Sequence, residues 1–289
     1  MNAHNTIAGF YSKTDGTWTG FLRKSDGTLA TFLPIDGGHT VVTGINASDT
    51  VIGYMQMDRG EQGFFRTAGG QVTYIGLSSY TVPFAINDKG QIAGSYLDNN
   101  HWRGFIRDAD GTVNTFASPD GSILNVLAIN NKGFTAGYYD DGAHAFFRTK
   151  KGTFTTFDVP TATYVNPLGI TKDNVVAGYW RNGTSTHGFV RQADGTIESF
   201  DEPDAKPGTT FPSAINDDGI IVGRYTGTTN VHGFARSPSG TYVSLDAPGA
   251  THGTWIDHIA PNGKMAGHYI DTPNHQHVMR ANKSLLSGL

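Results

Sequence analysis

The chain has 289 residues and a net charge of −4, with 38 glycines, 12 prolines and no cysteine. Abundant glycine without a glycine at every third position excludes collagen, and the lack of cysteine excludes disulfides, thiol catalysis and cysteine-bound zinc. Charged residues make up only 16% of the chain, which argues against a helix bundle, and the charge balance does not favour nucleic-acid binding.

One short motif recurs seven times along the chain: a β-branched or apolar residue, a small residue, glycine, and then an aromatic residue. It reads IAGFY at 7–11 and VAGYW at 176–180, for example. We call its glycine the marker glycine. The seven marker glycines are spaced 41–45 residues apart, with a mean of 43, and are Gly9, Gly53, Gly94, Gly137, Gly178, Gly223 and Gly267. This regularity indicates an internal repeat.

Each repeat predicts four short strands, which we name A to D. Strand A ends in a phrase such as FAIN (84–87), and a tight turn leads to strand B, which carries the marker glycine. Strand C reads GFLR at 20–23, GFVR at 188–191 and HVMR at 277–280, and DGT turns precede several D strands. In this assignment Thr19, Gln62, Arg103 and Gln276 take the place of the histidine that precedes strand C elsewhere.

Four antiparallel strands in about 43 residues are typical of a β-propeller blade. The sequence therefore predicts an all-β fold, a seven-bladed β-propeller of four-stranded antiparallel blades, forming a single domain over residues 1–289. Six blades with a spare partial repeat are the less favoured alternative. Because the chain starts inside a repeat, strand A of the first blade is expected to be missing or supplied by residues 285–289.

The combined pattern resembles the bacterial extracellular HAF-repeat family, named for the triplet His-Ala-Phe. That triplet stands at 144–146, and His-Gly-Phe stands at 187–189 and 232–234. The resemblance covers essentially the whole chain and implies a repeat fold and export. It implies no established reaction, so function has to be argued from individual residues.

Features shared by all repeats are expected to belong to the scaffold. One arginine per repeat ends strand C, and we expect each to bond turn carbonyls or turn Asn and Asp side chains of its own blade, rather than to form an anion-binding ring. The strand C phenylalanines are expected to pack between blades. These residues are Arg23, Arg66, Arg107, Arg148, Arg191, Arg236, Arg280, Phe21, Phe64, Phe105, Phe146, Phe189 and Phe234.

Positions that vary between repeats are the candidates for a functional site. The residue after the marker glycine and the start of strand A are both expected near the axis, beside the long B–C and D–A loops. Histidines gather in and near these loops, although histidine also simply suits polar loops. The predicted catalytic residues are His187, His232, His268, Tyr179 and Tyr138. The predicted substrate-binding residues are Arg224, His258, Trp255, Tyr54, Asn166, Asp257 and His144.

Tyrosine, histidine and arginine without a dominant carboxylate pair suit β-elimination on a uronate-containing polysaccharide. Arginine or histidine neutralises the sugar carboxylate, one His or Tyr takes the C5 proton, and another protonates the leaving oxygen. This hypothesis of a polysaccharide lyase also draws on analogy with other propellers. The main alternative is a non-catalytic lectin-like or protein-binding propeller, and a third is a glycoside hydrolase, which needs two facing carboxylates.

No resident metal or cofactor is predicted, although the sequence leaves open a structural or carboxylate-bridging Ca²⁺ ion. A metal site at His268, His275 and His277 is a minor alternative, because it matches no known ligand spacing. The expected partner is a poly- or oligosaccharide, with no nucleic acid and no membrane span, and the protein is expected to be a monomer. We expect a secreted or periplasmic location, with a cytoplasmic one left open.

Overall fold

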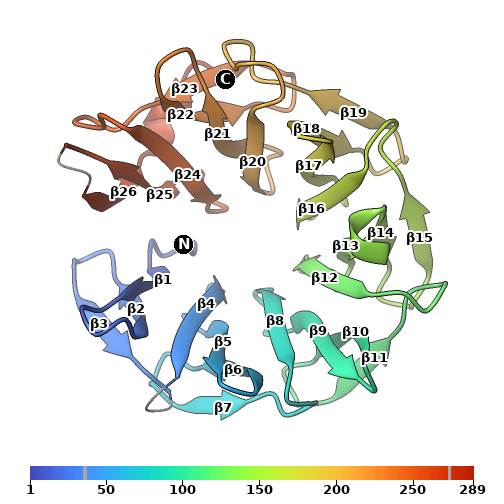
Figure 1. Cartoon of the computed structure of the whole chain (residues 1–289). Helices are drawn as coiled ribbons and strands as arrows, with labels where there is room; N and C mark the ends of the chain where they lie inside the picture. Colours follow the sequence, from blue (N-terminus) through green and yellow to red (C-terminus); the bar gives the residue numbers. More distant parts are fainter. Residues whose placement is uncertain (35–37, 273–274) are drawn as a thin grey trace. The chain divides into compact units, whose positions relative to one another are not determined.

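The predicted repeats form successive antiparallel sheets in the computed structural model, which describes residues 1–34, 38–272 and 275–289 (Figure 1). The chain divides into two compact parts. Part I contains Met1–Asp141 and Arg148–Phe154, and part II contains Gly142–Phe147 and Thr155–Leu289. The prediction of a single domain stays a prediction.

The strands follow the repeats in order, and we name the blades 1 to 7. Blades 1 to 3 contain β1 (Ile7–Ser12), β2 (Trp18–Arg23), β3 (Leu29–Phe32), β4 (His39–Ile45), β5 (Val51–Met57), β6 (Gly60–Arg66), β7 (Val72–Tyr74), β8 (Thr81–Ile86), β9 (Ile92–Asp98), β10 (His101–Arg107) and β11 (Val113–Phe116). Blades 4 and 5 contain β12 (Leu124–Ile129), β13 (Thr135–Tyr139), β14 (His144–Arg148), β15 (Phe154–Phe157), β16 (Tyr164–Ile170), β17 (Val176–Asn182), β18 (Ser185–Arg191) and β19 (Ile197–Phe200). Blades 6 and 7 contain β20 (Thr210–Ile215), β21 (Ile221–Thr226), β22 (Val231–Arg236), β23 (Tyr242–Leu245), β24 (Gly253–Ile259), β25 (Met265–Ile270) and β26 (Gln276–Ala281).

The sheet order confirms an all-β propeller built from the predicted repeats. Blades 2 to 5 are four-stranded sheets with the strands in chain order, and blade 1 is β1-β2-β3. Strands β20 to β26 form one seven-stranded sheet, in which a single parallel pairing, Val231 with Gly253, joins blade 6 to blade 7. Blades 1 and 7 have three strands each among the described residues: blade 1 lacks strand A, as one of the expected alternatives has it, and blade 7 lacks strand D.

The C-terminal residues do not form a strand. Lys283–Leu286 form the 3₁₀-helix η2, and η1 (Asp140–Gly142) is the other short helix. Of the two alternatives expected for strand A of blade 1, the missing strand is therefore the one observed within the described residues, and residues 285–289 do not supply it. The reason is burial: Leu286 is only 6% exposed and packs into an apolar cluster with Val222, Leu245 and Ile256. In the described part of the chain, no helix is long and apolar enough to cross a membrane.

The core lies between neighbouring sheets rather than inside one. In part II, Phe234 of blade 6 packs with Phe200, Ala177 and Val190 of blade 5, and in part I Phe105 of blade 3 packs with Ile52 of blade 2. Five strand C phenylalanines, Phe64, Phe105, Phe146, Phe189 and Phe234, are 0% exposed, whereas Phe21 is half-buried. Inter-blade packing is confirmed for Phe105 and Phe234.

The repeated arginines are scaffold, as predicted. Arg66, Arg107, Arg191 and Arg236 each donate from Nη1 to the carbonyl of the next residue, at the start of the C–D turn. The guanidinium groups also stack on aromatic rings of the preceding blade; that of Arg148 lies 4.1 Å from the Phe116 ring centroid. Cation–π contacts of this kind contribute about 0.5–2 kcal/mol each.

A β-bulge recurs in strand A of blades 2 to 7. In blade 6 the pairing of β20 with β21 shifts between Pro212 and Ala214, so the residue between them has no partner on β21. The same shift occurs between Val42 and Gly44, Pro83 and Ala85, Val126 and Ala128, Pro167 and Gly169, and Ile256 and His258. Because a bulge changes the direction of a side chain, the extra residue of each blade does not follow the alternation of side chains between the two faces of the sheet.

The A–B turns are linked from blade to blade by asparagine side chains. Asn87 Oδ1 accepts the N–H groups of Lys89 and Gln91 in its own turn, while Nδ2 donates to the carbonyl of Asn130 in the next blade. Asn2 and Asn46 donate in the same way, each to the next asparagine carbonyl. Each residue therefore caps its own turn and fastens it to the following one.

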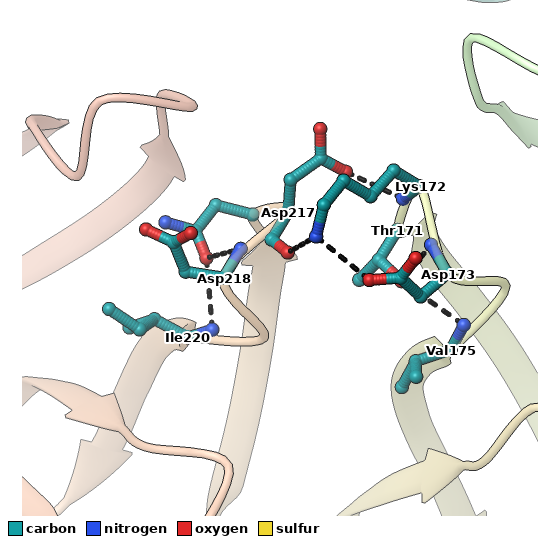
Figure 2. A network of polar contacts seen from close by, with 8 residues as sticks. Thr171, Lys172, Asp173, Val175, Asp217, Asp218 and Ile220 are labelled. Carbon is teal, nitrogen blue, oxygen red and sulfur yellow. Dashed lines mark hydrogen bonds and ion pairs between the residues drawn. The ribbon is translucent and has the colours of Figure 1, made fainter.

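Blades 5 and 6 use a different linkage, shown in Figure 2. Thr171 takes the place of the asparagine, and its Oγ1 accepts the N–H of Val175 at 3.1 Å. The backbone N–H of Lys172 donates to Asp217 Oδ1 of the next turn, and Lys172 Nζ donates to Asp173 Oδ2 and to the Asp217 carbonyl. The link between these two turns therefore consists of the Lys172 backbone N–H on the Asp217 carboxylate and Lys172 Nζ on the Asp217 carbonyl, while the Lys172–Asp173 ion pair lies within one turn.

Candidate functional site

Two variable positions of the repeat lie directly opposite each other. The residue after the marker glycine pairs with a residue of strand A, just before the bulge, in blades 2 to 7. The pairs are Val41–Tyr54, Val82–Ser95, Asn125–Tyr138, Asn166–Tyr179, Phe211–Arg224 and Trp255–His268. Directly opposite residues of an antiparallel pair share one face of the sheet, so each blade presents one pair. Blades 4 and 5 present the same Asn–Tyr pair, and an arginine and a histidine occur at this position in blades 6 and 7, in part II.

The pair of blade 7 is extended by a carboxylate. The His268 ring stacks on Trp255, with centroids 5.0 Å apart and planes inclined by 6°, and His268 Nδ1 lies 2.8 Å from Asp257 Oδ2. Asp257 is the extra residue of the bulge between Ile256 and His258, so the carboxylate that holds His268 comes from the irregular part of strand A. The His268 side chain is 23% exposed, so solvent or a ligand reaches it.

This geometry selects one tautomer of the neutral His268 ring. An ionised carboxylate only accepts hydrogen bonds, so Nδ1 carries the proton that it donates to Asp257. In the neutral imidazole the lone pair then lies on Nε2. Asp257 and His268 form a carboxylate–imidazole pair of the kind that orients a general base.

Blade 6 places a cation beside this pair. The Arg224 guanidinium stacks 4.7 Å from the Phe211 ring centroid. Partial burial lowers the pKa of Arg224, while the charges of Asp257 and Tyr179 act in the opposite direction. A guanidinium stays protonated throughout the physiological range, so Arg224 supplies a permanent positive charge that interacts with residues of both neighbouring blades.

Blade 5 contributes a phenol. Asn166 Nδ2 donates to the Tyr179 hydroxyl oxygen at 2.8 Å, which leaves the hydroxyl proton of Tyr179 available for another acceptor. Tyr164 and Tyr179 have ring centroids 6.1 Å apart, and the Arg181 guanidinium lies 5.2 Å from the Tyr179 ring. Asn166 Oδ1 is buried and has no hydrogen-bond partner among the described residues. The phenol and the amide are thus held by their neighbours in a polar patch.

The structure separates His187 and His232 from this cluster. His187 pairs with Trp180 across strands B and C, and its ring stacks on Trp180 with centroids 4.5 Å apart. Consecutive strand residues point to opposite faces, so Trp180 and His187 lie on the face opposite Tyr179. His232 stacks on Tyr225 in the same way, 5.2 Å between centroids, on the face opposite Arg224.

Each HAF histidine of blades 4 to 6 contacts an aspartate of its own blade, and this aspartate directly follows strand D. The Nδ1 atoms of His144, His187 and His232 lie 2.8–2.9 Å from the nearest oxygens of Asp158, Asp201 and Asp246. Each aspartate lies 14 residues after its histidine. Because the same contact recurs in three blades, it favours a structural role for the HAF histidine. The constant spacing of 14 residues between histidine and aspartate is visible in the sequence and could have revealed this pairing.

The register corrects the sequence alignment of blade 7. His277 pairs with Tyr269 just as His187 pairs with Trp180, and their rings stack 4.9 Å apart. His277, not Gln276, therefore occupies the HAF position, and Ala281 pairs with Met265 where the other blades place the strand C arginine. The motif was misread by one residue because HVMR is one residue shorter than HGFVR between histidine and arginine.

The other predicted site residues lie as follows. His258 is exposed in β24, immediately after Asp257. Tyr54 and Tyr138 belong to part I, and burial raises the pKa of Tyr54, with a further contribution from the Glu61 charge. Trp255 and Phe211 each have a ring covered by His268 or Arg224, so these rings serve first to hold those side chains. The roles predicted for all these residues stay predictions.

No family model matches the sequence, and no curated protein matches it significantly. Among solved structures, the β-propeller domain of the trilobed protease from Pyrococcus furiosus is similar with a TM-score of 0.71 at 9% identity, covering 98% of this chain and 93% of that one. Virginiamycin B lyase from Staphylococcus aureus gives 0.62 at 14% identity over 98% of each chain. A catalytically inactive histidine-to-alanine variant of that lyase with quinupristin gives 0.59 at 14% identity, over 92% and 93%. At these identities the likeness shows the fold, a β-propeller.

Proposed function

We propose that the protein is a lyase that cleaves a uronate-containing polysaccharide by β-elimination, at the cluster formed by blades 5 to 7. The observation that carries the proposal is the Asp257–His268 pair, stacked on Trp255, with the His268 side chain partly exposed. Elimination next to a carboxylate needs a base, a positive charge and an acid, and the same part of the chain supplies all three.

Four residues of this cluster take part in the proposed reaction. His268 Nε2 takes the proton from C5 of the uronate, while Asp257 holds Nδ1–H and stabilises the imidazolium that forms. Arg224 pairs with the sugar carboxylate and stabilises the negative charge that develops there. Tyr179 gives its hydroxyl proton to the leaving oxygen as the C4–O bond breaks. The products are a new hydroxyl end and a C4=C5 unsaturated uronate.

The fold comparison supports a lyase in one respect. Virginiamycin B lyase is a protein with this fold, and one of its histidine-to-alanine variants is catalytically inactive. Membership of the HAF-repeat family and export from the cell form part of the same proposal, since polysaccharide substrates lie outside the cell. Fractionation of an expressing bacterium tests the location, with activity expected in the periplasm or the medium.

The test is incubation with a panel of uronate polysaccharides, followed by the ultraviolet absorbance of unsaturated uronate ends and by reducing-end release. We expect both signals to rise with at least one substrate. His268→Ala should lower the rate by about 10²–10⁴-fold, the usual contribution of a general base. His252→Ala, an exposed histidine of the same blade outside the cluster, is the matched control and should retain the rate.

Three outcomes would contradict the proposal. Reducing ends without absorbance indicate a glycoside hydrolase, and sugar binding without either signal indicates a lectin-like module. Activity that survives His268→Ala but is lost in His187→Ala or His232→Ala would place the active site at the HAF histidines, which the sequence analysis also names as candidates.

A further inference from the structure

Blade 7 changes the environment of the HAF histidine. In blades 4 to 6 this histidine is held through Nδ1 by an aspartate that follows strand D. Blade 7 has no strand D among the described residues, and His277 instead contacts Asp271, from the B–C loop, through Nε2 at 2.9 Å. The stacked aromatic ring is kept, as Tyr269, so only the carboxylate side of the arrangement has changed.

A second imidazole joins the changed pair. His275 Nδ1 lies 4.0 Å from Asp271 Oδ1, and the His275 and His277 rings are 6.4 Å apart. One ligand atom from each of Asp271, His275 and His277 falls within 4.8 Å of the other two. The backbone N–H of His275 donates to Asp271 Oδ1 at 2.9 Å, which holds the carboxylate at the base of the loop. Among the other HAF histidines described above, none has a second histidine beside its aspartate.

We infer that Asp271, His275 and His277 bind a divalent transition-metal ion, with Zn²⁺ as the ion that the donor set fits best. Two neutral imidazoles and one carboxylate are common zinc ligands, and three protein ligands leave a fourth position for water. The chain has no cysteine, so thiolate does not compete for the ion.

The distances fit with a small adjustment. Zinc–nitrogen and zinc–oxygen bonds of about 2.0–2.2 Å in a tetrahedron place ligand atoms about 3.3 Å apart. The His277–Asp271 distance of 2.9 Å is about 0.4 Å shorter than this and widens when an ion replaces the shared proton. Ligand atoms of the cluster are up to 4.8 Å apart, so the His275 side chain, 70% exposed, has to swing inward by about 1.5 Å, which a single exposed imidazole does without disturbing the core.

The metal site is separate from the proposed active site. His268 pairs with Val278, and Tyr269 pairs with His277, so the two histidines belong to neighbouring positions on opposite faces of the sheet. The inference therefore does not rest on the proposed lyase activity, and a binding measurement tests it alone.

The test is titration of the tag-free chain with Zn²⁺ by calorimetry, and with Co²⁺ by its visible absorption, which reports the ligand geometry. We expect one tight site per chain and a rise in melting temperature on adding Zn²⁺. His275→Ala and Asp271→Asn should each weaken binding by about 100-fold or more, since even outer-shell changes cost about 10–100-fold. Both residues lie at the surface, and equal melting temperatures without metal verify that the variants fold.

Gln276→Ala is the matched control, because Gln276 is exposed and lies between the two histidines in sequence. It should bind Zn²⁺ as tightly as the unchanged chain. Absence of binding at micromolar Zn²⁺, or binding that His275→Ala and Asp271→Asn leave unchanged, overturns the inference. The second result would assign the ion to others of the eleven histidines.

Discussion

At the scale of single residues, the histidines differ in which ring nitrogen is held and by which carboxylate. His187 and His232 are fixed by aspartates that follow strand D, in an arrangement that the repeat reproduces. His268 is fixed by Asp257, which the bulge brings out of the strand, and this arrangement occurs in one blade. The same imidazole–carboxylate contact is thus part of the scaffold in one case and a candidate for chemistry in the other.

Replacing the orienting carboxylate tests this distinction. Asp257→Asn replaces an acceptor-only carboxylate by an uncharged amide, which offers Nδ1 of His268 either an acceptor or a donor. The Nδ1–H tautomer is then no longer enforced, and the imidazolium that forms when Nε2 acts as base loses the negative charge that stabilises it. If the lyase proposal holds, we expect kcat to fall by about 10²–10⁴-fold, with little change in KM, because the effect is on proton transfer. Steady-state kinetics on the active polysaccharide provide the measurement.

The equivalent change in the scaffold pair is the control for this prediction. Asp246→Asn makes the same carboxylate-to-amide change at the partner of His232 in blade 6, and we expect kcat to remain near that of the unchanged enzyme. Equal losses in the two variants would mean that imidazole–carboxylate pairs act through the stability of the fold, and Asp257 would then have no special role.

At the scale of strands, the bulge explains the marker glycine. A Cβ atom built on Gly223 would lie 2.2 Å from the carbonyl oxygen of Phe211, and one on Gly178 would lie 2.0 Å from that of Asn166. The carbonyl belongs to strand A just before its bulge, so the bulged strand occupies the space that any side chain would need. The requirement for glycine is steric and comes from the neighbouring strand.

Gly223→Ala is therefore expected to destabilise the protein. The new methyl group meets backbone rather than a flexible side chain, so strand A has to move, at a cost of about 1–3 kcal/mol or more in the free energy of unfolding. Gly76→Ala is the matched control, because a Cβ there has no neighbour within 4 Å. Thermal or denaturant unfolding measures both, and similar midpoints for the two variants would contradict the steric explanation.

The glycine spacing was sufficient to predict the strands and their order, because each marker glycine is a local requirement of one strand. It also predicted that Trp255 and His268 lie at comparable positions of two strands. The partnership with Asp257 was hidden, since a bulge changes the direction of a side chain without leaving a residue signature. His277 was misassigned because pairing between strands, and not the order of letters, sets its position.

At the scale of the whole molecule, the turns share an electrostatic feature. Asp26, Asp110 and Asp194 each accept the backbone N–H of the threonine two residues later, at 2.8–2.9 Å. This backbone hydrogen bond, followed by one from the threonine side chain, lowers the pKa of each carboxyl below its ordinary value of 3.8. A carboxyl with a lowered pKa stabilises the fold above 3.8, and the contribution disappears as the pH falls through the folded-state pKa.

Asn substitution of all three aspartates tests this dependence, because the amide oxygen still accepts the N–H but does not titrate. We expect the triple variant to melt below the unchanged protein at neutral pH, and the difference to shrink as the pH falls below 3.8. Melting temperatures measured across that range provide the comparison. A difference that stays constant with pH would show that the carboxylate charge contributes nothing in these turns.

The asparagine linkage between turns has an evolutionary consequence. Asn2, Asn46 and Asn87 each cap their own turn and donate to the same backbone atom of the following one, so the joint is identical at these three steps. A gene duplication that inserts one more copy of such a unit supplies both halves of the new joint at once. Descendants of this chain can then gain or lose a copy in a single genetic event, without compensating mutations at the junction. The joint between Thr171 and Asp217 departs from this pattern, because a threonine stands there in place of the asparagine and the contact runs through the Lys172 backbone N–H and Nζ instead.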